Sequence, residues 1–340
     1  MNLPLPKAKR GGERDSTQVV TRRPVSLVPA IPQPTLLEVK DLSLSFVQYS
    51  RGLRQKLLRV ISSLSLDIGP GEIVAVVGAS GSGKSLLAHA VLGIEPANAL
   101  VDGSLLFDGW ELTPERQAAL RGRDIVLIPQ AVSFLDPLMK VGRQVRNAVR
   151  AGDPVAVQKQ VFARYNLAPR VEDLYPFQLS GGMARRILVA MALVSGARLI
   201  IADEPTPGLD PLVLEEALGH FRELADEGRA IMFITHDINN ALKVADRIAV
   251  FYAGTTVEIA PVSDFSGQGD NLRHPYTRAL WRALPQNEFV PTSGHQPYPE
   301  NWPAGCLYHP RCSLVSDSCR LGRPESRMVR DGMVRCFHAS

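Results

Sequence analysis

Hydrophobic residues fall into short runs separated by polar, helix-compatible stretches. Residues 36–46 alternate apolar and polar side chains, as in a strand with one buried face, and 64–68 form a second strand-like run. Three aliphatic runs, at 73–77, 199–202 and 230–234, suit strands that are buried on both faces. Strands that alternate with helical stretches predict an α/β core around a mainly parallel sheet.

The composition changes twice along the 340-residue chain. Residues 1–35 contain six prolines, six basic residues and two acidic residues. We therefore expect this segment to be a flexible, solvated basic tail. The alternative is a basic arm that contacts anionic lipid headgroups. Residues 36–262 carry the strand pattern, with a polar helical insertion at about 113–180. Residues 263–340 are loop-like, rich in Pro, Gly and Arg, and contain all four cysteines.

Composition and charge narrow the class of protein. The chain is 45% hydrophobic and 21% charged, as expected of a soluble globular protein. No apolar stretch approaches the ~18–20 residues of a membrane span, and no apolar signal-peptide core lies near the start. The basic tail accounts for the formal charge of +4, which leaves 32 basic and 32 acidic residues in the rest. A neutral folded part argues against a nucleic-acid partner.

A glycine-rich motif follows the predicted strand at 73–77 and precedes a helical run. It matches the pattern G-x-x-x-x-G-K-[ST]. In that context, glycines let backbone N–H groups converge on phosphate oxygens at a helix N-terminus. We expect Lys84 to reach the β- and γ-phosphates and Ser85 to coordinate Mg²⁺. The predicted ATP-binding residues of this motif are Gly78, Ala79, Ser80, Gly81, Ser82, Gly83, Lys84 and Ser85.

Two adjacent acids, Asp203 and Glu204, end the apolar run at 199–202. A buried carboxylate at a strand end is costly unless a cation compensates its charge, and Mg²⁺ would do so. Asp203 therefore fits a metal-binding role, and Glu204 fits a group that polarises the water attacking the γ-phosphate. The alternative is a pair that only caps the turn at Pro205. The phosphate-binding motif makes the catalytic interpretation the stronger one.

The segment 179–183 lies between Lys84 and Asp203 and reads L-S-G-G-M. Alone it would be a helix-starting turn capped by Ser180. In this order and spacing it resembles the signature of the ATP-binding-cassette (ABC) ATPase family. Gln130 matches the family's Q-loop, 208–210 its D-loop and His236 its switch histidine. The resemblance covers about 36–262 and implies a P-loop NTPase fold with a RecA-like parallel-sheet core, an antiparallel β-subdomain and a helical subdomain.

This resemblance also implies how two chains share the chemistry. Two cassettes pair head to tail, so one chain's signature and D-loop contact the ATP on the other chain's phosphate loop. The residues assigned to this contact are Leu179, Ser180, Gly181, Gly182, Met183 and Asp210. The resemblance further assigns catalysis to Glu204, His236 and Gln130. It assigns Mg²⁺ binding to Ser85, Gln130 and Asp203. It assigns stacking on the adenine ring to Phe46 or Tyr49. Purely structural roles are the alternatives: a satisfied histidine at a strand end for His236, and a helix cap for Asp210.

The region after the cassette narrows the subfamily. The run His274-Pro-Tyr-Thr277 resembles the corresponding segment of peptide and nickel importer ATPases. All four cysteines lie within 31 residues: Cys306, Cys312, Cys319 and Cys336. A reducing cytosol disfavours disulfides, and a zinc site would lack the usual close C-x₂-C pairs. Four thiolates suit a [4Fe–4S] cluster, which some importer ATPases with a similar cysteine region carry, so we expect this cluster, with zinc as the alternative.

The leading interpretation is an ATP-hydrolysing, energy-coupling subunit of a bacterial importer for dipeptides or oligopeptides. The same role in a nickel, cobalt or metallophore importer is the first alternative, and a soluble ABC-type ATPase acting on nucleic acid or ribosomes is the second. The resemblance implies a related second ATPase subunit, two membrane permease subunits and an extracytoplasmic substrate-binding protein as partners. It places the chain at the cytoplasmic face of the inner membrane.

Overall fold

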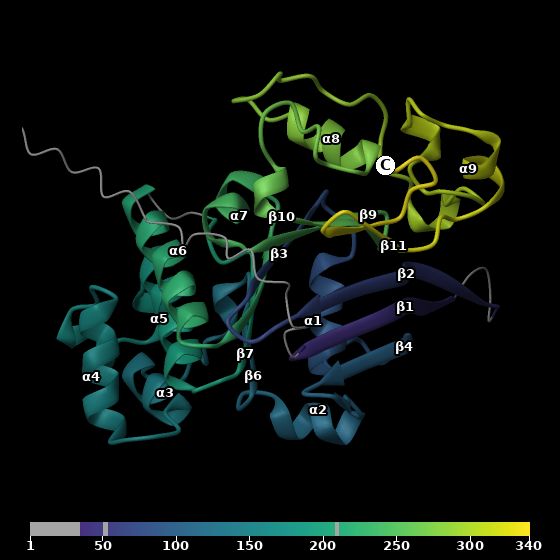
Figure 1. Cartoon of the computed structure of the whole chain (residues 1–340). Helices are drawn as coiled ribbons and strands as arrows, with labels where there is room; N and C mark the ends of the chain where they lie inside the picture. Colours follow the sequence, from purple (N-terminus) through teal and green to yellow (C-terminus); the bar gives the residue numbers. More distant parts are fainter. Residues whose placement is uncertain (1–34, 50–53, 208–210) are drawn as a thin grey trace, which may run out of the picture. The chain divides into compact units, whose positions relative to one another are not determined.

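The computed structural model describes residues 35–49, 54–207 and 211–340. The basic tail predicted at 1–35 therefore lies outside the described residues, except for Thr35, and so does the D-loop with Asp210. Within the described part, no helix is both long enough and apolar enough to cross a membrane. The elements from β1 onward belong to one structural unit, which holds two sheets (Figure 1).

The main sheet has eight strands in the order β11-β12-β10-β9-β3-β8-β7-β6. The five strands from β9 to β6 are parallel, and β10, β11 and β12 are antiparallel to their neighbours. This core confirms the predicted α/β class. The strands are β3 (Ile73–Gly78), β6 (Ile125–Ile128), β7 (Leu199–Asp203), β8 (Ala230–Thr235), β9 (Arg247–Tyr252), β10 (Thr255–Pro261), β11 (Arg327–Val329) and β12 (Gly332–Val334).

Both faces of the main sheet are buried, which explains the uninterrupted aliphatic runs in its strands. In β3, Ile73, Ala75 and Val77 pack on one face, together with side chains of α5 (Gly181–Val194) and α7 (Ile238–Val244). Val74 and Val76 pack on the other face, against α1 (Lys84–Leu92) and the smaller sheet. Figure 1 shows α5 and α6 (Pro211–Asp226) on one side of the main sheet and α1 on the other.

The smaller sheet is antiparallel, with the order β2-β1-β4-β5. Its strands are β1 (Leu37–Tyr49), β2 (Gln55–Ile68), β4 (Ala99–Phe107) and β5 (Trp110–Glu111). The sequence predicted only 64–68 of β2. The first six residues of β2 lack the alternation of buried and exposed positions because that half of the strand is largely exposed.

Short helices connect the two sheets to the signature helix α5. They are α2 (Pro114–Leu120), α3 (Val141–Ala148) and α4 (Pro154–Arg164), with single 3₁₀ turns at Val132–Phe134, Pro169–Asp173 and Pro176–Gln178. The region predicted as helical, 113–180, also contains β6, which belongs to the main sheet. A strand of only four residues gives little sequence signal between two helical stretches.

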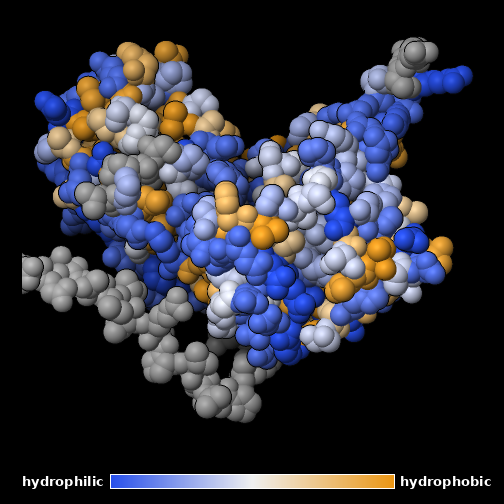
Figure 2. All heavy atoms as spheres, turned by 90° about the horizontal axis from the view of Figure 1, so that it is seen from above, coloured by the Kyte–Doolittle hydropathy of each residue, from blue (hydrophilic) through white to orange (hydrophobic). Residues whose placement is uncertain are grey.

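The C-terminal extension after residue 262 is anchored in the main sheet. It contains α8 (Pro275–Arg282), α9 (Asp317–Leu321) and 3₁₀ turns at Val262–Asp264, Pro299–Asn301 and His309–Arg311. The sequence predicted a loop-rich segment; in the structure its last strand, β12, pairs with β10, with Val334 opposite Glu258. On the face drawn in Figure 2, hydrophobic residues form scattered patches among hydrophilic ones.

Candidate functional site

The predicted catalytic residues lie at the carboxyl ends of neighbouring parallel strands. Asp203 ends β7, and His236 directly follows β8. The register places Asp203 opposite Ile234, and Val77, just before the phosphate loop, opposite Thr235. Parallel α/β sheets bind their ligands at this edge. The fold therefore gathers the phosphate loop, the two acids and the switch histidine at one edge of the sheet.

The phosphate loop has a backbone that requires glycine at several positions. Gly78, Gly81 and Gly83 have φ values of 158°, 76° and 98°. A Cβ added to Gly78 would lie 2.4 Å from the carbonyl oxygen of Phe251 in β9. Gly254, in the turn after β9, donates its N–H to the Ser82 carbonyl at 3.2 Å. The β9–β10 turn therefore braces the loop from the side.

Lys84 is held against the start of the phosphate loop. Its ammonium donates to the carbonyl oxygens of Gly78 at 2.9 Å and Ala79 at 3.2 Å. Burial lowers the pKa of Lys84, and the negative charges of Glu204 and Asp203 oppose that shift. The lysine is therefore a buried cation beside two carboxylates, ready to pair with the phosphate oxygens of a nucleotide.

The structure brings Ser85 and Asp203 together. The Ser85 hydroxyl donates to the Asp203 carboxylate, and burial raises the pKa of Asp203. The Oδ1 atom of Asp203 is buried and has no hydrogen-bond partner among the described residues. A hydroxyl beside a carboxylate oxygen with a free lone pair is a donor set that suits Mg²⁺. Gln130 is exposed at the end of β6, and its predicted link to the metal stays a prediction.

Glu204 and His236 form a direct pair. The Nδ1 atom of His236 lies 2.8 and 2.9 Å from the two carboxylate oxygens of Glu204. The side chain of Glu204 is 10% exposed, whereas that of His236 is 67% exposed. Glu204 adopts a left-handed backbone, with φ of 47°, and its N–H donates to the Ile234 carbonyl. Such strain in a non-glycine residue is typical of functional sites, and here it fixes the carboxylate beside the histidine.

Arg185 in α5 is a site residue that the sequence analysis did not assign. Its guanidinium is buried and donates to the backbone carbonyls of Pro129 at 3.2 Å and Glu204 at 3.1 Å. It therefore ties the signature helix to the residue before Gln130 and to the backbone of the catalytic glutamate. An arginine on the buried face of an amphipathic helix was the available signal, because such a charge needs partners.

The signature segment lies apart from these groups. Ser180 caps α5, and its Oγ accepts the Met183 N–H at 3.2 Å. Gly181 is exposed, and a Cβ added to Gly181 or Gly182 would meet nothing within 4 Å. Among the described residues, no hydrogen bond joins 179–183 to Lys84, Asp203 or Glu204. Nothing in the described residues therefore explains why both positions are glycine.

The two candidate adenine contacts occupy the far half of β1. Phe46 is half-buried opposite Leu58, and Tyr49 is 68% exposed, with its hydroxyl accepting from Gln55 at 3.3 Å. Ile61, which lies opposite Leu44, is the side chain that packs under Gly83 of the phosphate loop. The strand pair thus runs from the phosphate loop toward these aromatics. Their contact with adenine stays a prediction.

The four cysteines of the extension are free thiols. The amides of Leu314 and His338 each donate to a cysteine sulfur at 3.4 Å, those of Cys312 and Cys336 respectively. Burial raises the pKa of Cys306 to about 11 and also raises the pKa of Cys312 and Cys336. In the part of the chain that the structure describes, no three His, Cys, Asp or Glu side chains are placed to hold a metal ion. The arrangement of the described residues therefore adds no support for the predicted cluster, which stays a prediction.

The His-Pro-Tyr-Thr run anchors the extension through a buried polar network. Glu258 of β10 is fully buried and accepts the N–H groups of Arg273 at 2.8 Å and His274 at 2.9 Å. Burial lowers the pKa of His274 to about 3, so its ring is neutral, and its Nδ1 caps α8 by accepting the Tyr276 N–H at 3.0 Å. These contacts give the His-Pro-Tyr-Thr run a structural role, the anchoring of the extension to β10, which the sequence analysis did not predict.

Comparison with known proteins matches both halves of the chain. A family model described as "ABC transporter" covers residues 61–207, and one described as "Oligopeptide/dipeptide transporter, C-terminal region" covers 257–319. The dimeric structure of a bacterial ABC transporter cassette, MJ0796, has a TM-score of 0.58 at 25% identity, covering 66% of this chain and 98% of that chain. The fold and the comparisons define an ABC ATPase, which binds ATP with Mg²⁺ and hydrolyses the ATP.

Relatives cover nearly the whole chain, including the extension. The oligopeptide transport ATP-binding protein AppD of Bacillus subtilis is 31% identical over 89% of this chain and 96% of its own length. The dipeptide transport ATP-binding protein DppD of Escherichia coli is 34% identical over the same shares, 89% and 96%. The chain belongs to the family of ATP-binding subunits of oligopeptide and dipeptide ABC transporters. The resemblance and the fold class inferred from the sequence are confirmed.

Proposed function

We propose that this chain powers the uptake of dipeptides or oligopeptides through an ABC importer, working at the cytoplasmic face of the inner membrane. The observation that carries the proposal is the match of the C-terminal region, residues 257–319, to the oligopeptide/dipeptide family. Relatives named for peptide transport support it, since they align along both the cassette and the extension. The proposed domains are the cassette at 36–262 and the extension at 263–340.

The proposed mechanism assigns a role to each group at the sheet edge. Amides of the phosphate loop and the Lys84 ammonium bind the β- and γ-phosphates of ATP. Ser85 and Asp203 would hold Mg²⁺, which would supply positive charge to neutralise the phosphate oxygens. Glu204 accepts a proton from the attacking water. The water oxygen bonds to the γ-phosphorus while the bond between the γ-phosphorus and the leaving ADP oxygen breaks. His236 is fixed by Glu204 at 2.8 Å and stabilises the transferring phosphoryl group.

A second ATPase subunit completes each ATP site in this proposal. Ser180 and Gly182 contact the γ-phosphate held by the partner, and Asp210 contacts the partner across the dimer. Support comes from Gly181 and Gly182, whose missing side chains leave open space within this chain. A helix N-terminus that presents bare backbone suits close approach by a phosphate. The partner is a related, non-identical chain.

The surface around Gln130 is the proposed contact with two membrane permease subunits. Directly after Gln130, the exposed apolar side chains of Val132, Phe134 and Leu138 are 39%, 60% and 87% exposed. Exposed apolar groups gathered in one short segment are typical of a binding surface for another protein. Movement of this segment, coupled to ATP binding through Gln130, would be passed to the permeases. A substrate-binding protein outside the membrane would deliver the peptide.

Uptake in cells tests this function. A strain that lacks the gene is given a labelled dipeptide and, separately, labelled nickel, and is complemented with wild type, Lys84→Ala or Glu204→Gln. We expect dipeptide uptake to be lost on deletion and restored by the wild type alone. Loss of nickel uptake alone would move the assignment to a metal importer. ATPase activity stimulated by DNA or RNA, with both uptakes intact, would favour the nucleic-acid alternative.

We also propose a [4Fe–4S] cluster on Cys306, Cys312, Cys319 and Cys336, with zinc as the competing occupant. Support is chemical: four free thiols lie in one extension, and backbone amides donate to two of them. Sulfur ligands of metal centres commonly accept such bonds, which tune the bound group. Iron and sulfide analysis of anaerobically purified protein tests it, with about four of each expected per chain. Colourless protein with stoichiometric zinc would contradict it.

A further inference from the structure

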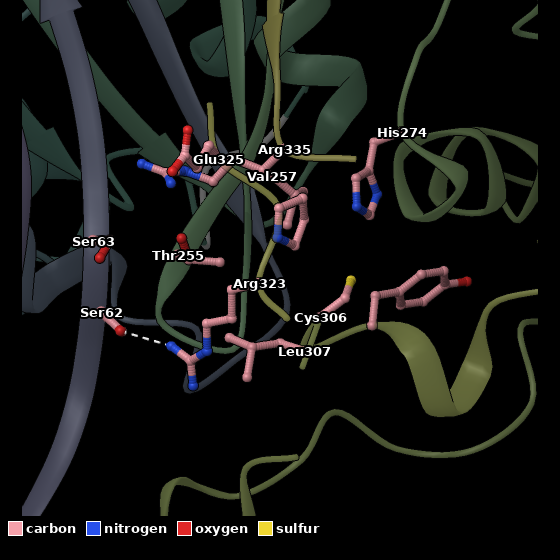
Figure 3. A pocket seen from close by; sticks show the side chains of 12 residues that line it. Ser62, Ser63, Thr255, Val257, His274, Cys306, Leu307, Arg323, Glu325 and Arg335 are labelled. Carbon is pink, nitrogen blue, oxygen red and sulfur yellow. Dashed lines mark hydrogen bonds between the residues drawn. The ribbon is translucent and has the colours of Figure 1, made fainter. Parts of the chain in front are cut away.

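A cavity of about 190 Å³ lies between the smaller sheet, the β9–β10 turn and the C-terminal extension (Figure 3). Its lining is mostly apolar, with Val257 of β10 and with Leu307 and Pro324 of the extension. Ser62 and Ser63 of β2 form the opposite side (Figure 3). A cavity of about 150 Å³ holds benzene, so this one has room for a compact organic molecule slightly larger than benzene.

Two guanidinium groups line this apolar space. Arg323 donates to the Ser62 hydroxyl at 2.7 Å, the contact drawn in Figure 3, and its guanidinium lies 5.4 Å from the Trp302 ring centroid. Among the described residues, no carboxylate lies within ion-pair distance of Arg323. Burial and the positive charge of Arg59 lower the pKa of Arg323. Arg323 is exposed and pairs with no acidic side chain of the described residues, so its guanidinium is accessible to an anion at the cavity.

The second guanidinium has an unused donor. Arg335 pairs with Asp41 at 3.2 Å through one terminal nitrogen, but its Nε is buried without a hydrogen-bond partner among the described residues. Because this Nε is itself buried, a ligand in the cavity does not reach it, and the exposed Arg323 is the more accessible of the two guanidinium groups. One acid, Glu325, also lines the cavity, but it is exposed and forms no ion pair with either arginine.

We propose that this cavity binds a small organic carboxylate with a compact apolar body. The carboxylate would accept from the Arg323 guanidinium, and the apolar body would lie against Val257, Leu307 and Pro324. Arginine suits this role because its planar fork matches a carboxylate. Cys306, one of the four proposed cluster ligands, also lines the cavity, whereas the other three cysteines do not, so the cavity adjoins the proposed cluster and shares one residue with it.

The cavity adjoins the brace of the phosphate loop. Ser62 and Thr255 line it and flank Gly254, whose carbonyl accepts the Ser62 N–H at 2.8 Å. Gly254 in turn donates to Ser82 of the phosphate loop. A ligand in the cavity therefore touches both neighbours of the residue that braces the loop. Its binding is expected to change the KM for ATP, by about twofold or more.

Benzoate and its neutral analogue benzamide are the probes for a calorimetric titration of the full chain. For a ligand of this size we expect benzoate to bind with a Kd of about 0.1–10 mM, and benzamide at least about tenfold more weakly. Arg323→Gln removes the guanidinium and is expected to weaken benzoate binding about tenfold. Val257→Phe fills the cavity while keeping both arginines, and is expected to abolish binding.

Arg320→Gln is the matched control, since Arg320 is an exposed arginine of the same extension that does not line the cavity. It should leave benzoate binding unchanged. Equal binding of benzoate and benzamide, or equal loss in Arg323→Gln and Arg320→Gln, would overturn the carboxylate assignment. No saturable benzoate binding by a wild-type chain that still binds ATP would overturn the site. A KM for ATP unchanged by saturating benzoate would refute the link to the phosphate loop.

Discussion

The phosphate loop and the signature segment are both rich in glycine and serine, but the fold uses their glycines differently. Gly78 has a left-handed φ, and a Cβ there would lie 2.4 Å from a backbone oxygen of β9. Gly182 lies in the first turn of α5 with an ordinary φ, and a Cβ there would meet nothing within 4 Å. The first glycine is required by this chain. The second makes physical sense only if something outside the described chain approaches it.

The polar side chains of the two regions differ in the same way. Lys84, Asp203 and Glu204 are buried and lie close enough to influence one another's charges. Ser180 is exposed, and among the described residues its side chain bonds only to the first turn of its own helix. One buried phosphate site and one exposed helix start that nothing in the described residues matches are what the proposed shared ATP site requires. This difference supports pairing with a second cassette.

Glu204→Gln should give the largest effect on activity. The amide cannot accept a proton from the attacking water, so we expect the kcat of ATP hydrolysis to fall about 10³-fold, in the range for loss of a general base. ATP binding should persist, because Lys84 and Ser85 are unchanged. Steady-state ATPase assays and a binding titration check both parts. Unchanged kcat would show that another group activates the water.

The same substitution, glycine to alanine, should separate the two regions. Gly182→Ala is expected to lower ATPase activity of the assembled transporter on the order of 10²-fold, since it hinders backbone donors from reaching a phosphate. Its stability should hold or rise slightly, because alanine favours helix. Gly78→Ala should instead destabilise the chain by about 1–3 kcal/mol through the clash with β9. Thermal unfolding distinguishes them, and equal destabilisation would contradict the comparison.

Arg185 connects the two regions, so its removal should affect both. Arg185→Met leaves the carbonyls of Pro129 and Glu204 without their donor. We expect a loss of about 1–3 kcal/mol in the free energy of unfolding, together with a lower kcat, because the backbone of Glu204 is released. Denaturant unfolding measures the first and ATPase assays the second. Arg229→Met is the control, since Arg229 donates to the carbonyl of Leu193, near the opposite end of α5 from the signature.

The anchor of the extension should show the smallest effect, a pH dependence of stability. Burial lowers the pKa of His274 to about 3 in the folded chain, from an ordinary value of 6.5, so between these pH values the unfolded chain binds a proton that the folded chain does not. The free energy of unfolding is therefore unaffected by the titration of His274 above pH 6.5. As the pH falls below 6.5, it decreases by up to about 1.4 kcal/mol per pH unit. His274→Asn, which still caps a helix, should flatten the curve between pH 6.5 and 5. An identical slope would contradict a neutral His274.

Local sequence predicted the half of the site that is built by consecutive residues. The phosphate loop and the Asp203-Glu204 pair each follow an aliphatic strand, and parallel strands bring their ends together. Arg185 and the network around Glu258 were not predicted because their partners lie far away in the sequence, and only packing reveals them. The exposed half of β2 and the short strand β6 were not predicted, because neither segment has a clear alternation of apolar and polar side chains.

ATP binding to the isolated full chain tests the central claim, that this chain's phosphate loop and signature serve different ATP molecules. The dissociation constant is measured for wild type, Lys84→Ala and Gly182→Ala. We predict that Gly182→Ala binds within about twofold of wild type, while Lys84→Ala binds at least about tenfold more weakly. Weakening by Gly182→Ala as large as that by Lys84→Ala would contradict the account, because the signature would then contact the ATP of its own chain.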